Sequence, residues 1–423
     1  MLHLSRARSG KASSTSTRTP TCVSVWTAQG DALMAMEGLF GEAVDRIGGE
    51  PISARMARKA PIRHLDPSLL MVTLMLATYG VIMVHSTTAT SQSAIDPAIF
   101  FTRQIGFLIA GVVALLVVSF FDYRYIGSLA LPIYGVTLVA LVLVLTPLGT
   151  LRSGATRWIS LGPFEAQPSE LAKVAIIVAL AAFLAERKGE VRVRDVALSV
   201  GMVAIPGWLI YKQPDLGTMM VFVALLGAGL LSAGAKIRHF IFLGITGLVA
   251  VIIVLQMGVL HDYQVQRLTS FLDPNPDVQS VGYNLTQSKI AIGSGGMRGK
   301  GLGGKNTQTS LDFVPEQHTD FIFTAVGEQL GFLGSTTLLG MFAFLLWRGL
   351  RIAAMSRDLF GTLLASGIVA LWAFQIFVNV GMTMGIMPIT GIPLPFISYG
   401  GSSLITNFVA VGLLLNIHMR RYL

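Results

Sequence analysis

The sequence predicts an all-α polytopic membrane protein, a bundle of ten transmembrane helices with one large extracytoplasmic loop between the seventh and the eighth. Composition is the first observation behind this prediction. Of 423 residues, 53% are hydrophobic and only 13% are charged, about half the ~25% of charged residues in soluble proteins. The second observation is a series of apolar stretches, each close to the roughly 20 residues that a helix needs to cross a bilayer.

Residues 1–65 precede the first apolar stretch and are rich in Ser, Thr, Ala and Arg. No run in this zone is apolar and long enough to span a bilayer, so we expect a disordered basic cytoplasmic tail. The transmembrane domain then covers residues 66–423. Its ten apolar stretches are centred near Leu76, Val112, Leu138, Ile177, Val203, Val223, Val251, Leu333, Val369 and Leu413.

Basic residues mark one side of this predicted bundle. The tail, the even-numbered connections and the residues after the last stretch hold 21 of the 31 lysines and arginines. Because cytoplasmic loops carry such an excess, both termini are expected in the cytoplasm. The net charge of +9 therefore indicates topology and contact with lipid headgroups rather than nucleic-acid binding. A single cysteine, Cys22, excludes an internal disulfide framework and a multi-cysteine metal site.

The long outer loop, residues 260–318, is the first candidate for chemistry, since loops of this length are usually functional or disordered. Asp273 and Asp277 are four residues apart and lie near Arg267 and Lys289. This combination suits acid–base work or binding of a phosphate-bearing ligand, and a solvated loop with turn aspartates has the same spacing. The glycine-rich stretch 293–304 fits neither a dinucleotide fingerprint nor a P-loop, because no strand precedes it and key positions differ.

Other polar residues lie where apolar stretches enter the membrane from the outer side. Glu170 and Lys173 are three apart on one helical face and can pair, either as a structural anchor or as functional groups. Asp215 is expected to cap the helix that follows it. Further ionisable or polar side chains flank the eighth and tenth stretches, where such groups are costly and therefore candidates for function. They are Glu316, His318, Asp320 and Ser398.

Six blocks in this order resemble the SEDS family (shape, elongation, division and sporulation) over residues 67–421. The blocks are QPSELAK at 167–173, QPDLGT at 213–218, RLTSFLDP at 267–274, TQSKIAIGSGG at 286–296, PEQHTDFIF at 315–323 and PLPFISYGGSS at 393–403. The IAIGSGG stretch followed by residues 306–308 is more similar to the rod-shape branch, RodA, than to the division branch, FtsW.

The resemblance implies a peptidoglycan glycosyltransferase that polymerises lipid II into glycan strands at the outer face of the bacterial cytoplasmic membrane during cell elongation. It implies a class B penicillin-binding protein, a transpeptidase, as partner. The family's essential acid lies shortly after a Phe-Leu-x-Pro step and before Gly-Tyr, which is Asp277 here, with Asp273 as second choice. Two positions depart from the usual family pattern, Val278 and Asn284.

Chain growth joins an acceptor sugar hydroxyl to the anomeric carbon of a lipid-pyrophosphate donor, and the hydroxyl needs a base. We assign Asp277 to that role. The pyrophosphate leaving group needs cations, for which Arg267, Lys289 and Lys173 are candidates, with Glu170 holding Lys173. A divalent cation, Mg²⁺ or Mn²⁺, would suit carboxylates and pyrophosphate, but its ligands cannot be identified from the sequence. The expected substrate-binding set is completed by Gln287, Glu316, His318, Asp320 and Ser398.

Two other functions are compatible with ten spans and buried charges. A flippase for lipid-linked precursor would need polar groups along its whole path, whereas the polar clusters here gather on one side and no inverted repeat is visible. A non-enzymatic scaffold for the penicillin-binding protein would need no essential carboxylate in the loop.

Overall fold

The computed structural model describes residues 64–90, 97–152, 155–162, 164–187, 191–256, 281–304, 307–314 and 316–421. The chain divides into two units, Met1–Ala60 and Pro61–Leu423, and all described residues belong to the second. All but the last two residues of the predicted basic tail, 1–65, therefore lie outside the described residues. So do three residues of the long loop, Arg267, Asp273 and Asp277.

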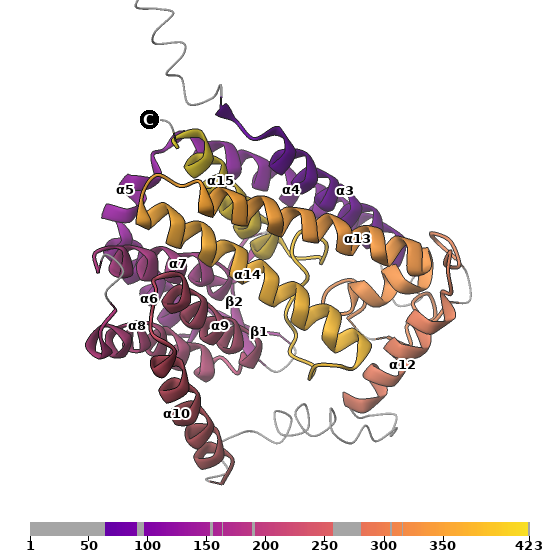
Figure 1. Ribbon diagram of the computed structural model, residues 1–423. Coiled ribbons are helices and arrows are strands. Elements are labelled where there is room, and N and C mark those ends of the chain that lie inside the picture. Colours follow the sequence, from indigo (N-terminus) through magenta and orange to yellow (C-terminus); the bar gives the residue numbers. More distant parts are fainter. Residues whose placement is uncertain are drawn as a thin grey trace, which may run out of the picture. The chain divides into compact units, whose positions relative to one another are not determined.

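The described residues form a bundle of helices with one small sheet (Figure 1). In chain order the elements are α3 (Pro67–Thr90), α4 (Pro97–Phe120), α5 (Tyr123–Ser128), α6 (Ala130–Val144), β1 (Gly149–Arg152), β2 (Ala155–Leu161), β3 (Phe164–Ala166), α7 (Pro168–Ala185), α8 (Val193–Lys212), α9 (Leu216–Ser232), α10 (Ile237–Gln256), α12 (Val281–Ser294), α13 (Ile322–Ala354), α14 (Leu359–Met384) and α15 (Gly401–Met419).

Each of the ten predicted apolar stretches forms a helix: α3, α4, α6 to α10 and α13 to α15. Seven are long and apolar enough to cross a membrane, while α6, α9 and the Ile237–Ile253 part of α10 are shorter apolar helices. The 15 residues of α6 span roughly 22 Å at 1.5 Å per residue, less than the ~30 Å hydrocarbon core. The all-α polytopic class is confirmed with these seven helices.

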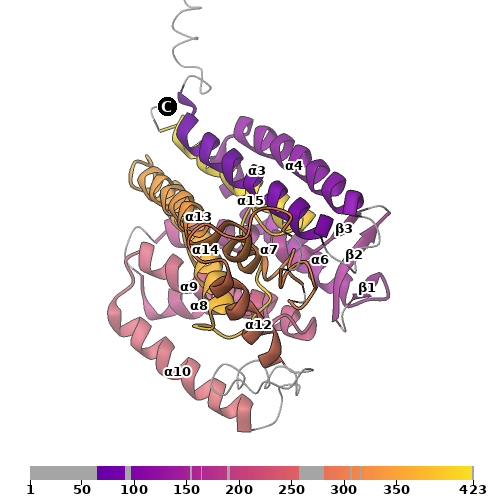
Figure 2. The same ribbon diagram turned by 90° about the vertical axis from the view of Figure 1, so that its right-hand side faces the viewer.

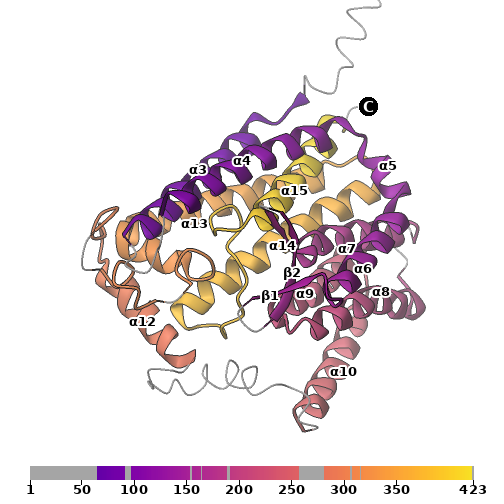
Figure 3. The ribbon, with the colours of Figure 1, turned by 180° about the vertical axis from the view of Figure 1, so that it is seen from behind.

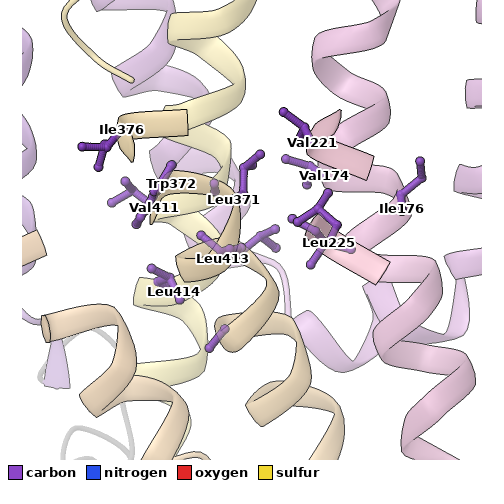
Figure 4. Close-up of a cluster of buried hydrophobic side chains, with 14 of the residues drawn as sticks. Val174, Ile176, Val221, Leu225, Leu371, Trp372, Ile376, Val411, Leu413 and Leu414 are labelled. Carbon is purple, nitrogen blue, oxygen red and sulfur yellow. The ribbon is translucent and has the colours of Figure 1, made fainter. Parts of the chain in front are cut away.

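Helices α7, α9, α14 and α15 pack together and build the core (Figure 4). Val174 and Ile176 of α7 lie with Val221 and Leu225 of α9, next to side chains from α14 and α15. Helix α15 also packs along α4 (Figure 3). Helix α10 lies at the periphery, and most of its large apolar side chains are exposed (Figure 2). This contrast fits a bilayer, where a peripheral helix meets lipid rather than water.

A three-stranded antiparallel sheet adds to this architecture between α6 and α7. Its order is β1-β2-β3, with Gly149 opposite Ile159 and Ile159 opposite Ala166. The sequence pattern did not predict these strands. The sheet pairs the backbone of the connection and delivers the chain directly to Pro168, the first residue of α7.

Ion pairs tie together the helix ends that the charge pattern places on one side, which we call the basic end. Arg348 Nε, near the end of α13, donates to Asp66 Oδ2 just before α3 at 2.9 Å. Arg420 Nε, after α15, lies 3.4 Å from Asp122 Oδ2, the cap of α5. The start of α3 and the ends of α4, α13 and α15 therefore meet at the same end of the bundle, as predicted.

Asp66 makes the stability of the folded protein depend on pH. Burial alone would raise the pKa of its carboxyl, but hydrogen bonds from the Ser68 hydroxyl, the Arg348 guanidinium and the Leu69 amide together hold the pKa below the ordinary 3.8. A lowered carboxyl pKa stabilises the folded protein above about pH 4, and this contribution is lost as pH falls through the folded pKa.

We therefore expect Asp66→Asn to lower the free energy of unfolding by about 2 kcal/mol at neutral pH, the usual range for hydrogen bonds to a charged group. Thermal unfolding of the detergent-purified protein measures the difference at pH 7 and at the lowest pH that the protein tolerates, and the difference should shrink as the wild-type carboxylate takes up a proton. A difference that is equally large at both pH values would contradict this account of Asp66.

Candidate functional site

The candidate site lies at the outer end of the bundle, defined here as the end where α7, α9, α13 and α15 begin. Three contacts join elements there. Ser402 at the start of α15 accepts a hydrogen bond from the Gln167 amide, 3.0 Å away, just before α7. Asn379 of α14 donates to the carbonyls of Asp320 and Ile392 at 2.9 and 2.8 Å. These contacts bring together segments that lie far apart in the sequence.

Glu170 and Lys173 form a buried ion pair in the first turns of α7. Lys173 Nζ lies 2.7 Å from Glu170 Oε1, and the two side chains are 2% and 5% exposed. Pro168 begins the helix, where its missing N–H costs no hydrogen bond. The predicted pairing is confirmed. Ionisable groups at membrane depth are candidates for function, and the roles of Glu170 and Lys173 in substrate binding stay predictions.

Buried polar atoms without partners occur on the outer halves of the helices that surround this pair. Within the described residues, no hydrogen-bond partner is found for Ser169 Oγ, Gln375 Oε1, Asn379 Oδ1 and Thr406 Oγ1. They belong to α7, α14 and α15, which pack against one another. A buried polar atom needs a partner, and water or a substrate hydroxyl supplies one. The interior of the outer half is therefore suited to a polar ligand.

Arg157 and Asp215 have structural partners. Arg157, on β2, donates through Nε to the Gln213 carbonyl at 3.0 Å and also contacts the Pro214 carbonyl. Asp215 caps α9 by accepting from the amide of Thr218 at 3.2 Å and from its hydroxyl at 2.9 Å. The predicted helix cap is confirmed, and the sheet is fastened to the turn before α9.

Gln287 and Lys289 lie on α12, a helix in a segment that the sequence analysis treated as loop. Ser288 between them is fully buried. Its hydroxyl lies 2.5 Å from Thr324 Oγ1 of α13 and donates to the Thr383 carbonyl of α14 at 2.8 Å. The Lys289 side chain is exposed and passes over the backbone at the end of α14. Helix α12 thus carries a cation at the outer end of the bundle.

His318 and Ser398 lie in the connections before α13 and α15. The His318 ring packs edge-on against Phe100, with centroids 5.2 Å apart, and its carbonyl accepts from the Tyr399 amide at 2.9 Å. The Ser398 hydroxyl is buried and accepts from the Leu394 amide at 2.8 Å. Both residues have contacts that hold these connections together, and their predicted role in substrate binding stays a prediction.

Glu316 and Asp320 differ in their surroundings. Glu316 is exposed and accepts from the Thr319 hydroxyl at 2.9 Å, within its own turn. Asp320 is half-buried, and its carbonyl accepts from Asn379. Their substrate-binding roles also stay predictions. Across the described ranges, no group of three or more His, Cys, Asp or Glu side chains is placed to hold a metal ion.

Sequence reasoning missed Glu328, an acid inside the eighth apolar stretch. Its side chain is 0% exposed, and Oε1 accepts from Lys300 Nζ at 2.8 Å and from the Gln308 amide at 2.7 Å. Oε2 accepts from the Thr309 amide at 2.9 Å. The missed signal was available, since an ionisable residue at membrane depth is a functional candidate by default. The carboxylate fastens the glycine-rich loop, residues 295–304, and the segment after it to α13.

Helix α13 is broken directly after Glu328. Gly331 has φ 64°, and the backbone there leaves the helical conformation. The glycine-rich loop pairs with the break: the Lys300 amide donates to the Glu328 carbonyl at 3.0 Å, and the Phe332 amide donates to the Gly296 carbonyl at 2.9 Å. A Cβ on Gly331 would collide with the loop backbone. The glycine-rich stretch, which fits no nucleotide motif, therefore completes a discontinuous helix.

Comparison with known proteins gives consistent matches along the described domain. The family model described as "Cell cycle protein", which represents FtsW, RodA and SpoVE, matches residues 67–423. Stage V sporulation protein E of Bacillus subtilis (strain 168) is 40% identical over 357 residues, which cover 83% of this chain and 96% of that protein. Peptidoglycan glycosyltransferase MrdB of Escherichia coli (strain K12) is 37% identical over 359 residues, 85% of this chain and 94% of that protein.

A solved structure is also similar. One chain of the structure described as "Structural coordination of polymerization and crosslinking by a peptidoglycan synthase complex" aligns with a TM-score of 0.72 and 32% identity. The alignment covers 85% of this chain and 98% of that one.

The Glu328 contacts lead to a prediction about stability. Glu328→Gln removes the buried charge that Lys300 pairs with, and we expect a loss on the order of 3 kcal/mol in the free energy of unfolding. Thermal unfolding in detergent measures this loss, and Glu316→Gln, a change at an exposed acid of the same outer end, is the matched control. If both variants unfold at the wild-type temperature, the Glu328 carboxylate does not hold the loop.

Proposed function

The chain belongs to the SEDS family of FtsW, RodA and SpoVE proteins, and we propose that it is a peptidoglycan glycosyltransferase that polymerises lipid II at the outer face of the bacterial cytoplasmic membrane. The structural observation that best supports this proposal is the buried ammonium of Lys173 at the outer end of an apolar bundle. A lipid-pyrophosphate donor has apolar tails that suit the membrane and an anionic headgroup that suits such a cation.

The reaction requires a base and a stabilised leaving group. The acceptor hydroxyl oxygen forms a bond to the anomeric carbon of the donor, while the bond from that carbon to the pyrophosphate oxygen breaks. The hydroxyl proton passes to a carboxylate, which we assign to Asp277, with Asp273 as the second choice. A positioned base of this kind contributes about 10²–10⁴-fold to the rate. Direct displacement inverts the anomeric centre.

The departing pyrophosphate develops negative charge that fixed cations stabilise most strongly in a site with little water. Lys173 is held at 2.7 Å by Glu170 and is shielded from solvent, so its position is set before substrate arrives. The exposed Lys289 ammonium offers a second cation on α12. Arg267 is the third member of this proposed set, and a divalent cation such as Mg²⁺ or Mn²⁺ is a further candidate.

The proposed setting follows from the same relatives. A class B penicillin-binding protein is the proposed partner. This proposal is supported by the structure of a peptidoglycan synthase complex, one chain of which is 32% identical to this chain. We place both termini in the cytoplasm, with ten spans, on the basis of the alternating basic residues. We favour a role in cell elongation, although the relatives also include a sporulation protein.

Replacing Lys173 tests the proposed leaving-group site. We expect Lys173→Met to lower lipid II polymerisation by about 10²-fold or more, the usual effect of removing one preorganised group that stabilises transition-state charge. The measurement is glycan product formed by purified protein with its penicillin-binding partner. Lys212→Met, which removes an exposed lysine at the same end of the bundle, is the matched control and should retain activity. Equal activity in the two variants would exclude Lys173 from the reaction.

Replacing Asp277 tests the proposed base. Asp277→Ala should abolish polymerisation while the amount of protein in the membrane stays unchanged. Asp273→Ala is the matched control, and the reverse pattern would assign the base to Asp273. Full activity in both variants would move the base elsewhere. No product from folded wild-type protein would favour the flippase or the scaffold function instead.

A further inference from the structure

A basic cavity lies at the opposite end of the bundle from the candidate site, between the end of α7 and the start of α8. It has a volume of about 410 Å³, and its lining residues are Arg187, Arg192, Arg194, Asp195 and Leu198. Volumes of 300–1,000 Å³ are typical of ligand sites. Three guanidinium groups face one carboxylate here, so the lining has an excess of positive charge.

The one carboxylate in the lining does not neutralise this excess. Asp195 Oδ1 lies 3.1 Å from Arg187 Nε, and Oδ2 accepts from the Arg192 backbone amide at 3.0 Å. Arg187 also stacks over the Phe183 ring, with 4.6 Å from its guanidinium carbon to the ring centroid. The side chains of Arg192 and Arg194 are exposed and form no ion pair with any described residue. One arginine is thus fixed in place, and two remain available to an anion.

The position of the cavity indicates what kind of anion it meets. Both α7 and α8 are long and apolar enough to cross a membrane. The cavity lies where α7 ends and α8 begins, which is the level of the lipid phosphates. Loops on this side carry the excess of basic residues that contact anionic headgroups. Phosphates of the lipid headgroups are therefore the anions that we expect these three arginines to meet.

Helix α8 continues from the cavity as an apolar stripe. Arg194 and Leu198 are four residues apart, and Ile205 follows seven residues later, so the three lie on one helical face. Leu198 lines the cavity and is 45% exposed, Ile205 is 54% exposed, and Trp208 lies one turn further along at 61%. A phosphate bound to the arginines would place an acyl chain along Leu198 and Ile205. A free phosphate would make no use of this stripe.

We propose that the cavity binds an anionic phospholipid, with the phosphate held by Arg187, Arg192 and Arg194 and one acyl chain lying along α8. Guanidinium groups suit this role because their planar N–H donors match phosphate oxygens in pairs. The site is separate from the proposed glycosyltransferase chemistry, since Lys173 lies in the first turns of α7 and Arg187 follows the other end of this helix, Ala185.

Lipid binding to the purified full-length chain tests the proposal, by native mass spectrometry in detergent with dioleoylphosphatidylglycerol, dioleoylphosphatidylcholine or inorganic phosphate. The variant Arg192→Gln/Arg194→Gln should bind phosphatidylglycerol about tenfold more weakly than wild type, since each arginine near a membrane surface contributes several-fold to the affinity. The matched control is Arg238→Gln/Arg357→Gln, which removes two exposed arginines of the same end outside the cavity. It should bind as wild type does.

A second variant separates a lipid from a soluble anion. Leu198→Gln leaves the arginines in place and breaks the apolar stripe, so it should weaken phosphatidylglycerol binding and leave inorganic phosphate unaffected. Equal phosphatidylglycerol binding by wild type and by Arg192→Gln/Arg194→Gln would overturn the proposal. Inorganic phosphate that binds wild type as tightly as phosphatidylglycerol would also overturn it, in favour of a soluble anion.

Discussion

The outer half of this protein depends on the break in α13 and on the carboxylate beside it. An interrupted helix at membrane depth frees backbone carbonyls and amides that no water can satisfy, so another part of the protein must pair with them. The glycine-rich loop does so on both sides of Gly331. The Glu328 carboxylate holds the loop by accepting hydrogen bonds from the Lys300 ammonium and from the amides of Gln308 and Thr309. The loop in turn follows α12, whose Ser288 is bonded to α13 and α14. The position of the Lys289 cation is therefore a consequence of how the break is filled.

Polar groups in this fold are concentrated at the two ends of an apolar core, and the two ends differ. At the basic end, charged side chains pair across helix termini, as Asp66 does with Arg348 and Asp122 with Arg420. At the outer end, Lys300 and Glu328 also join two elements, but Glu170 and Lys173 pair within one helix, and buried oxygens around them have no partner among the described residues. Pairs between helices fasten the bundle. A pair within one helix fastens nothing to its neighbours, so it is free to serve a ligand.

The sequence predicted best what depends on short-range geometry. The ten apolar helices could be predicted because a run of about 20 apolar residues has few alternatives to a helix in a membrane. The Glu170–Lys173 pair and the Asp215 cap follow from spacings within one or two turns. The sheet at 149–166 was missed because its strands are short, and the contacts of Glu328 were missed because Lys300 lies 28 residues away. Asp277, Asp273 and Arg267 fall outside the described residues, and their roles remain predictions.

Helix α7 connects the proposed chemistry to the membrane surface. Its first turn contains Glu170, and the positive end of its dipole favours anions at the same place as the Lys173 ammonium. In the proposed reaction, the helix dipole and the Lys173 ammonium both act on the pyrophosphate. Both are in place before substrate binds. Because α7 is buried along most of its length, the surrounding helices fix its direction as well as its depth. A cation held this rigidly, in surroundings of low dielectric, stabilises developing charge with little reorganisation, which is the condition for electrostatic catalysis.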